Sequence, residues 1–154
     1  MKHRELLVVA LGGNAIKQAH ESGTTEEQFR NVDATARQLA GLVRLGYGLV
    51  VTHGNGPQAG ALLIQQEEAD SLVPAQSLAV CGAMTQGQIG WMLQNRLRFH
   101  LVSAGIDRPC ASLVTQVVVD ENDPDFLHPS KPVGPFYGRE EAAELAENKG
   151  YVVR

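Results

Sequence analysis

Two short apolar runs, each followed by a Gly-Asn turn, constrain the fold of this chain more than any other feature. Residues 6–11 read LLVVAL and lead into Gly12-Gly13-Asn14. Residues 48–52 read GLVVT and lead, after His53, into Gly54-Asn55-Gly56. Short runs with β-branched residues, bounded by glycine, are typical of strands, and we expect the first to be buried on both faces of a sheet.

A helix between these runs joins them into a βαβ unit. The pattern over residues 24–45 predicts this helix: Thr24 or Thr25 can cap it, with an acidic or amide residue three positions on, and Gly46 can stop it. The crossover is expected to be right-handed and the two strands parallel. Both glycine loops should therefore lie at the carboxyl edge of one sheet, where α/β proteins bind ligands.

The rest of the sequence predicts three more helices, a third strand and an irregular arm. The helices are expected from Pro57 toward Glu68, over residues 75–104 and over residues 139–148. Glycines at 82, 87 and 90 each cost roughly 1 kcal/mol against alanine, so they indicate a break in the long helix or close packing on another backbone. Residues 112–119 predict the third strand, residues 120–138 the arm, and residues 151–153 the start of a further strand.

Composition excludes several classes of protein. A length of 154 residues predicts one domain, and 44% hydrophobic with 19% charged residues is typical of a globular protein. A net charge of −4 without a Lys/Arg cluster argues against nucleic acid as a partner. No apolar run approaches the roughly 20 residues that span a bilayer, so no membrane partner is expected. Cys81 and Cys110 are predicted to be buried free thiols in a reducing cytosol.

The glycine loops predict an anion site. Glycine has no Cβ, so backbone amides can come into contact with a ligand, and a helix N-terminus behind each loop adds unpaired N–H groups. Asn14 and Asn55 can add neutral side-chain donors. A carboxylate or phosphate is therefore expected there, and a pair of tight turns without a ligand is the alternative.

A dinucleotide is a poor match for this site. Gly54-x-Gly56-x-x-Ala59 fits the dinucleotide fingerprint formally, but that fingerprint requires an acidic residue about 20 positions on, and residues 73–76 have none. The sequence also lacks the GxxxxGK[ST] pattern of P-loop proteins. A dinucleotide oxidoreductase is therefore rejected.

Five segments together resemble carbamate kinase, a member of the amino-acid-kinase superfamily. They are VVALGGNAI (8–16), HGNGPQAG (53–60), CGAMTQGQIGWML (81–93), TQVVVD (115–120) and HPSKPVGPFY (128–137). Their order and spacing match the family from one end of the chain to the other. Five motifs in the same order are a much more specific signal than one glycine loop.

The resemblance implies a fold and a reaction. It implies a three-layer αβα sandwich with a mainly parallel sheet, a cytoplasmic homodimer, and reversible phosphoryl transfer between ATP and carbamate with Mg²⁺, often serving arginine breakdown. The chain would comprise an acceptor-binding lobe (1–120) and part of a protruding arm subdomain (121–154). The ATP/ADP site with Mg²⁺ would lie mostly in a C-terminal half that this chain lacks, and no metal ligand is assigned here.

The resemblance also implies roles for individual residues. Gly12, Gly13 and Asn14 match the first family loop around carbamate or carbamoyl phosphate, and Gly54 and Asn55 match the second. Lys131 matches the arm lysine that reaches over the site, and a lysine between two prolines is a suitable point charge for phosphoryl transfer. The alternative for Lys131 is a solvated side chain in a stiff turn.

Three other features receive structural interpretations. His53 is expected to bond the loop backbone rather than to act in catalysis. Residues 84–87 (MTQG) match a family motif, but helix packing beneath the site is the favoured role. Asp120 follows the third expected strand, and metal binding by this single carboxylate is disfavoured.

Because the chain resembles half of a family member, it is expected to be a fragment or truncated product without turnover of its own. Its exposed sheet edge predicts oligomerisation or marginal solubility. Two alternatives stay open: a non-catalytic anion-binding or oligomerisation scaffold with the same fold, and another superfamily kinase that acts on an amino-acid carboxylate. The arm motif with Lys131 argues against the second.

Overall fold

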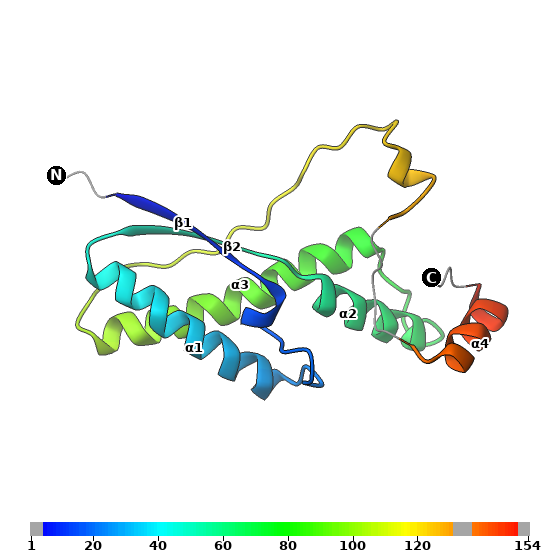
Figure 1. The fold of residues 1–154 in the computed structure, drawn as a ribbon, viewed down its shortest axis with the longest axis horizontal. Helices are drawn as coiled ribbons and strands as arrows, with labels where there is room; N and C mark the ends of the chain where they lie inside the picture. Colours follow the sequence, from blue (N-terminus) through cyan, green and yellow to red (C-terminus); the bar gives the residue numbers. More distant parts are fainter. Residues whose placement is uncertain (1–4, 131–136, 151–154) are drawn as a thin grey trace.

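The computed structural model describes residues 5–130 and 137–150, which form two strands with a helix between them and further helices after the second strand (Figure 1). The elements are β1 (Leu6–Leu11), the 3₁₀ turn η1 (Gly13–Ala15), α1 (Thr25–Arg44), β2 (Gly48–His53), α2 (Gly56–Ala69), α3 (Leu78–Ser103), the 3₁₀ turn η2 (Pro124–Phe126) and α4 (Arg139–Lys149). The predicted βαβ unit is present, and α2 begins at the predicted place.

The two strands are parallel, as the sequence predicted. Their register pairs Leu6 with Gly48 and Leu11 with His53. Both strands therefore end side by side, and the residues that follow them emerge from the same edge of the sheet. This arrangement brings the two glycine loops together.

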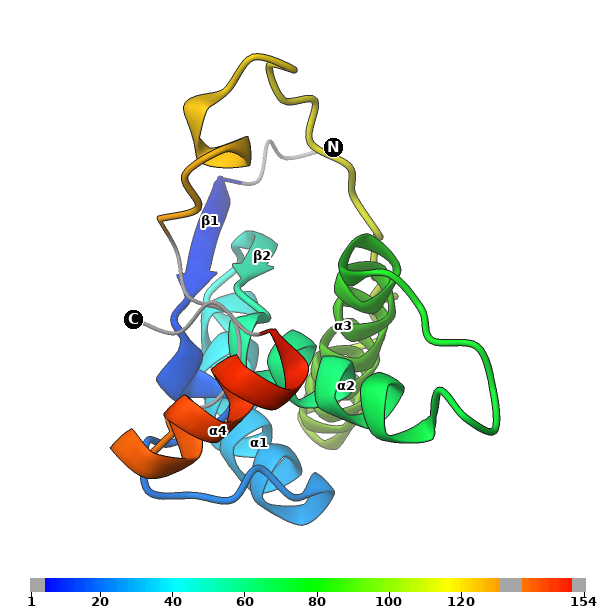
Figure 2. The same ribbon diagram turned by 90° about the vertical axis from the view of Figure 1, so that its right-hand side faces the viewer.

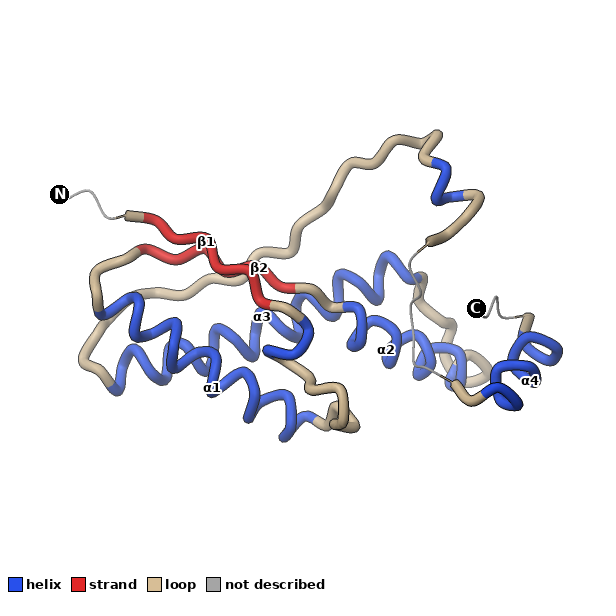
Figure 3. Tube along the Cα trace, viewed as in Figure 1, coloured by secondary structure: helices blue, strands red, loops and turns tan. Residues whose placement is uncertain are grey.

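Helices cover only one face of the sheet. Figures 1 and 3 show α1 and α3 on the same side of β1 and β2, and the view in Figure 2 agrees. Burial alternates along both strands: Leu11 and Val51 pack against the helices, whereas Leu6 is 64% and Val8 69% exposed. The expectation that β1 is buried on both faces is wrong for this chain, because no described element lies over the second face.

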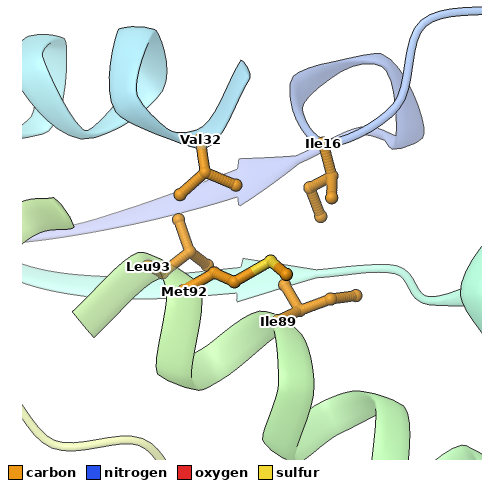
Figure 4. Close-up of a cluster of buried hydrophobic side chains, with 5 residues drawn as sticks. All are labelled: Ile16, Val32, Ile89, Met92 and Leu93. Carbon is orange, nitrogen blue, oxygen red and sulfur yellow. The ribbon is translucent and has the colours of Figure 1, made fainter. Parts of the chain in front are cut away.

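The core consists of two clusters between the helices and the sheet. One joins Ile16, Val32, Ile89, Met92 and Leu93, whose side chains point toward one another in Figure 4. The other joins Ala40, Val43 and Leu101 near the C-terminal ends of α1 and α3. Complete burial of a side chain such as Ile16 contributes roughly 1.5–3 kcal/mol, so these contacts fix both helices to the sheet.

Helix α1 matches its prediction closely. Thr24 is the N-cap, its side chain accepts a hydrogen bond from the Glu27 backbone, and the Glu27 carboxylate accepts one from the Thr24 backbone, which completes a capping box. At the other end Gly46 has a φ of 104°, a left-handed conformation that favours glycine. The sequence signals at both ends are therefore confirmed.

Helix α3 is continuous, so the predicted break does not occur. It begins at Leu78, capped by Ser77, rather than at residue 75. Close packing occurs at Gly90, where an added Cβ would lie 2.9 Å from Cβ of Ser112, but the neighbour is a side chain and not the expected backbone, and a Cβ at Gly82 or Gly87 would have no atom within 4 Å. Leu78 and Met84 of this helix are 51% and 46% exposed.

The third predicted strand, residues 112–119, is not formed. Residues 108–115 run in the opposite direction to α3 and bond to it once per helical turn: Arg98, Gln94, Gly90 and Gln86 contact Arg108, Cys110, Ser112 and Thr115 respectively. Four helical residues rise about 6 Å, close to the length of two extended residues. The apolar run therefore follows a helix and has no neighbouring strand, and Val118 is 97% exposed.

The arm and the last helix partly match the sequence. Over its described part the arm is irregular except for η2, and α4 ends at Gly150 with a φ of 68°. The predicted strand at residues 151–153 lies outside the described residues. No helix within the described ranges is long and apolar enough to cross a membrane.

Candidate functional site

The two glycine loops form one open site at the carboxyl edge of the sheet. Because Leu11 pairs with His53, Gly12 and Gly54 leave the sheet side by side. Gly12, Gly13, Asn14, Gly54 and Gly56 are exposed, and Asn55 is half-buried. The structure therefore places at one edge of the sheet the two loops that hold the five residues assigned to substrate binding from the sequence.

Neither backbone conformation nor packing explains the loop glycines. In the described residues, positive φ angles occur only at Gly23, Gly46, Gly105 and Gly150. A Cβ added at Gly12, Gly13, Gly54 or Gly56 would have no heavy atom within 4 Å. Alanine would therefore fit at each position in this chain, and the missing side chains leave the loop backbone open to close approach by a ligand.

The first loop is anchored by an apolar side chain. Gly12 leads into η1, whose end residue Ile16 is 1% exposed within the core cluster of Figure 4. A 3₁₀ turn of three residues follows this loop, so the expected long helix directly behind it is absent and α1 begins only at Thr25. The amide side chain of Asn14 forms no hydrogen bond with the described residues, so it is available to a ligand.

The second loop is anchored by hydrogen bonds to α3. Nδ2 of Asn55 donates to Oγ1 of Thr85 at 2.9 Å and to the carbonyl oxygen of Gly82 at 3.1 Å. Thr85 is 0% exposed and its hydroxyl in turn bonds the Cys81 carbonyl oxygen at 2.9 Å. Both amide hydrogens of Asn55 are thus used within the protein, and the loop presents backbone N–H groups instead of a free side-chain donor. The favoured role of residues 84–87, packing beneath the site, is confirmed for Thr85.

A buried pair of glutamines also supports the second loop. Nε2 of Gln58, in the first turn of α2, donates to Oε1 of Gln28 in α1 at 3.1 Å. Nε2 of Gln28 donates to the Gly23 carbonyl oxygen at 2.7 Å. Both side chains are buried, so they fix the start of α2 relative to α1. Sequence analysis missed this pair, because a polar residue at one helical position does not indicate its partner 30 residues away.

The donors at this site are neutral. The first N–H groups of a helix have no acceptor within it, so those of Gly13, Asn14 and Gly56 are open to an external acceptor. His53 has Nδ1 3.1 Å from the Gly54 carbonyl oxygen, which requires Nδ1 to carry the hydrogen and matches its expected structural role. Backbone donors at a sheet edge, with the N-terminus of α2 behind one loop, are suited to an oxyanion.

Two charged residues singled out from the sequence, Lys131 and Asp120, were considered for this site. Lys131 lies outside the described residues. Asp120 is exposed in the arm, and its carboxylate accepts from the Asn122 backbone at 2.9 Å. No group of three His, Cys, Asp or Glu residues that could hold a metal ion occurs in the described part of the chain. Cys81 and Cys110 are free thiols, and burial raises the pKa of Cys110, an effect that Arg98 partly opposes.

Residues 5–128 match the sequence model of the amino acid kinase family. This match covers most of the chain, including both glycine loops. The chain belongs to the amino acid kinase family. The described residues show two parallel strands with one helical layer, which is consistent with a truncated αβα fold of this family.

Several proteins similar to this amino acid kinase are carbamate kinases. It is 52% identical over 150 residues to the carbamate kinase of Thermococcus kodakarensis, a match that covers 96% of this chain and 48% of that protein. The carbamate kinase of Giardia lamblia bound to citric acid superposes with a TM-score of 0.92 at 39% identity, covering 100% of this chain and 50% of the other. The same enzyme bound to AMP-PNP gives 0.83, covering 98% and 48%. The chain thus spans about half the length of the relatives it matches.

Proposed function

We propose that this chain forms the acceptor-binding half of a carbamate kinase, which catalyses ATP + carbamate ⇌ ADP + carbamoyl phosphate. Gly12, Gly13 and Asn14 on one side, and Gly54 and Asn55 on the other, hold the carboxylate of carbamate or the phosphoryl group of carbamoyl phosphate. The family match and the carbamate kinase relatives support this proposal. The whole reaction needs groups that this half does not contain.

One observation carries the proposal: four loop glycines that neither φ angles nor packing require in this chain. Two of them follow β1 and two flank Asn55, so all border the same edge of the sheet. Their backbone N–H groups are fixed before a ligand arrives, because the core holds one loop and α3 holds the other. Preorganised donors of this kind stabilise the charge that develops during phosphoryl transfer.

The nucleotide belongs to the missing half in this proposal. One Giardia relative is described as bound to AMP-PNP, an ATP analogue. ATP/ADP with Mg²⁺ is assigned to the C-terminal half because the family resemblance implies it. When bound, Mg²⁺ would neutralise phosphate charge.

The remaining features of the proposal follow the family. Residues 1–120 form the acceptor lobe and residues 121–154 part of the protruding arm, from which Lys131 supplies a positive charge over the site. The complete enzyme works as a cytoplasmic homodimer, in the family's setting of arginine breakdown. The chain alone has no turnover.

A coupled assay tests the activity of the chain alone. Purified protein is given ADP, Mg²⁺ and carbamoyl phosphate, and ATP formation is followed with a full-length carbamate kinase as the positive control. We expect no ATP above background from residues 1–154. Robust turnover would show that the acceptor half does not need the missing half.

Binding to the glycine loops is tested separately with inorganic phosphate, followed by two-dimensional amide NMR. We expect amide shifts in both loops and at least about tenfold weaker binding in Gly54→Ala, because the new methyl group blocks backbone approach. Gly87→Ala in α3 is the matched control, since a Cβ there also has no atom within 4 Å. Equal binding by Gly54→Ala and the unmodified chain would contradict the proposed site.

The open sheet face favours a second candidate, an oligomerisation scaffold with the same fold. Leu6, Val8 and Val50 are 64%, 69% and 44% exposed on that face. Contiguous exposed apolar surface is typical of association sites. Sedimentation of the purified chain separates the candidates: stable oligomers without phosphate binding would favour the scaffold, and phosphate binding at the loops would favour the kinase half.

A further inference from the structure

A basic cavity lies at the opposite end of the molecule from the glycine loops. It has a volume of about 420 Å³ between the C-terminal parts of α1 and α3, which lie together at the left of Figure 1. Its lining consists of Arg37, Ala40, Gly41, Arg44, His100, Ser103 and Ala104, with no acidic residue. Arg44 lies 19 residues after Thr25 on α1, roughly 28 Å along the helix at 1.5 Å per residue, so this cavity is separate from the loops.

The cavity carries more positive charge than its surroundings neutralise. Arg44 forms no ion pair or hydrogen bond within residues 5–130 and 137–150. The one adjacent carboxylate, Asp33, is shared: its Oδ1 contacts Arg96 at 2.6 Å and His100 at 2.9 Å, while Arg37 lies 3.6 Å from Oδ2. Arg96 and Arg37 therefore share one carboxylate, and Arg44 has no carboxylate partner among the described residues, in a chain whose net charge is −4.

Asp33 stays ionised and belongs to the helix interface. Partial burial would raise its pKa, but the hydrogen bonds from Arg96 and His100 outweigh that effect and the pKa is lowered. Because Arg96 and His100 already occupy Oδ1, this carboxylate cannot also neutralise Arg44. The side chains that remain unmatched in the cavity are Arg44 and, in large part, Arg37.

Helix dipoles explain only part of this arrangement. A cation in the last turn of a helix is a common, modest stabiliser, and Arg44 is placed for that role in α1. However, the carbonyl groups at both helix ends are already bonded: Leu45 N donates to Gly41 O, and Ala104 N donates to His100 O. Arg37 lies two turns earlier, and a Cβ at Gly41 would have no atom within 4 Å, which leaves the floor of the cavity open.

From this geometry we infer a second anion site, in which Arg37 and Arg44 clamp a multiply charged phosphate-class ligand and Ser103 donates a hydrogen bond. One guanidinium group can donate two parallel hydrogen bonds to the oxygens of a phosphate. These bidentate contacts are stronger and more directional than those of an ammonium group. The volume accommodates a ligand larger than a single phosphate, so pyrophosphate chemistry fits better than orthophosphate. The site is independent of the function proposed above.

Pyrophosphate titration of the whole 154-residue chain tests this site. Calorimetry at low ionic strength should show binding that weakens at least about tenfold in the double variant Arg37→Gln/Arg44→Gln. Arg44→Lys should bind pyrophosphate more tightly than the double variant but more weakly than the unmodified chain, because lysine keeps the charge without the paired donors. A parallel titration with citrate, a tricarboxylate, shows whether the site selects phosphate oxygens. Equal affinity for citrate and for pyrophosphate would overturn the phosphate assignment.

Matched variants keep the two anion sites distinguishable. Arg30→Gln removes the same charge from a residue that pairs with Glu21 outside the cavity, and it should leave the affinity unchanged. Gly54→Ala should weaken loop binding and leave the cavity titration intact. The inference fails if pyrophosphate does not bind, if Arg30→Gln weakens binding as much as the double variant, or if only Gly54→Ala affects it. Circular dichroism confirms that each variant is folded.

Discussion

The two glycine loops emerge side by side from one sheet edge but are held by different chemistry. The first is anchored by the apolar side chain of Ile16, 1% exposed beneath η1. The second is anchored by the amide of Asn55, which bonds Thr85 and Gly82 on α3. One loop thus depends on core packing and the other on two hydrogen bonds.

This difference determines what each loop can offer a ligand. Because Ile16 anchors the first loop, the side chain of Asn14 remains unbonded within the described residues. Because Asn55 is itself the anchor of the second loop, its donor hydrogens are occupied, and that loop contributes backbone groups. Two similar Gly-Asn motifs therefore have different roles: the first asparagine can touch a ligand, and the second positions the backbone.

The largest expected effect comes from removing the apolar anchor. Ile16→Ala should lower the free energy of unfolding by about 2–5 kcal/mol, since it leaves a cavity among Val32, Ile89 and Met92. Ile16→Val is the conservative control and should cost about 0.5–1.5 kcal/mol. Urea denaturation followed by circular dichroism measures both. Equal, small losses would mean that the core does not anchor the first loop.

Removing the polar anchor should cost less. Asn55→Ala and Thr85→Val each break the bond between their side chains and should cost about 1–3 kcal/mol, because buried polar groups lose partners. A double-mutant cycle tests the link directly: the double variant should be more stable than the sum of the single losses predicts. Thr85→Ser keeps the hydroxyl and should retain most of the coupling. Strictly additive losses would contradict the anchor.

Local signals made much of this fold predictable from sequence. The capping box at Thr24, the left-handed Gly46 and the Gly-bounded apolar runs each act within a few residues, and each was confirmed. The parallel pairing followed from one helix lying between two strands. The same reasoning placed both glycine loops at one edge.

The errors concern contacts with distant partners. Residues 112–119 have the composition of a strand, yet a strand requires a hydrogen-bonded neighbour, and here Gln86 of α3 bonds the Thr115 backbone instead. The anchor of Asn55 could not be predicted because Thr85 lies 30 residues away on a helix with no local sign of that contact. The role of Gly90 in α3 could not be predicted for the same reason, because only its contact with Ser112 distinguishes close packing from a break in the helix.

The smallest expected effect is a pH dependence of stability, which the ties of the first loop should show and those of the second should not. The chain between the first loop and α1 is tied by the carboxylate of Glu21, which accepts from the Gln18 backbone at 2.8 Å and from Asn31 at 2.6 Å. Arg30 adds a third contact at 2.7 Å. The Gln18 backbone hydrogen bond is the main factor that lowers the pKa of Glu21; burial opposes it, and Asn31 and Arg30 assist it. The second loop has only neutral ties at Asn55.

Because the pKa of Glu21 is lower in the folded chain, its contribution to stability is complete above the unfolded value of about 4.5 and disappears as the pH falls through the folded value. Glu21→Gln should therefore be less stable than the unmodified chain at pH 7, and the gap should close toward pH 3. Asn31→Ala removes one hydrogen-bond donor to Glu21. In this variant the pH-dependent stability that Glu21 contributes should decrease only in part. Thr85→Val should lose similar stability at both pH values, because its bond to Asn55 carries no charge. Urea denaturation at a series of pH values measures the stability of all three variants. If Glu21→Gln loses the same stability at pH 3 and at pH 7, the ionised carboxylate does not stabilise the first loop.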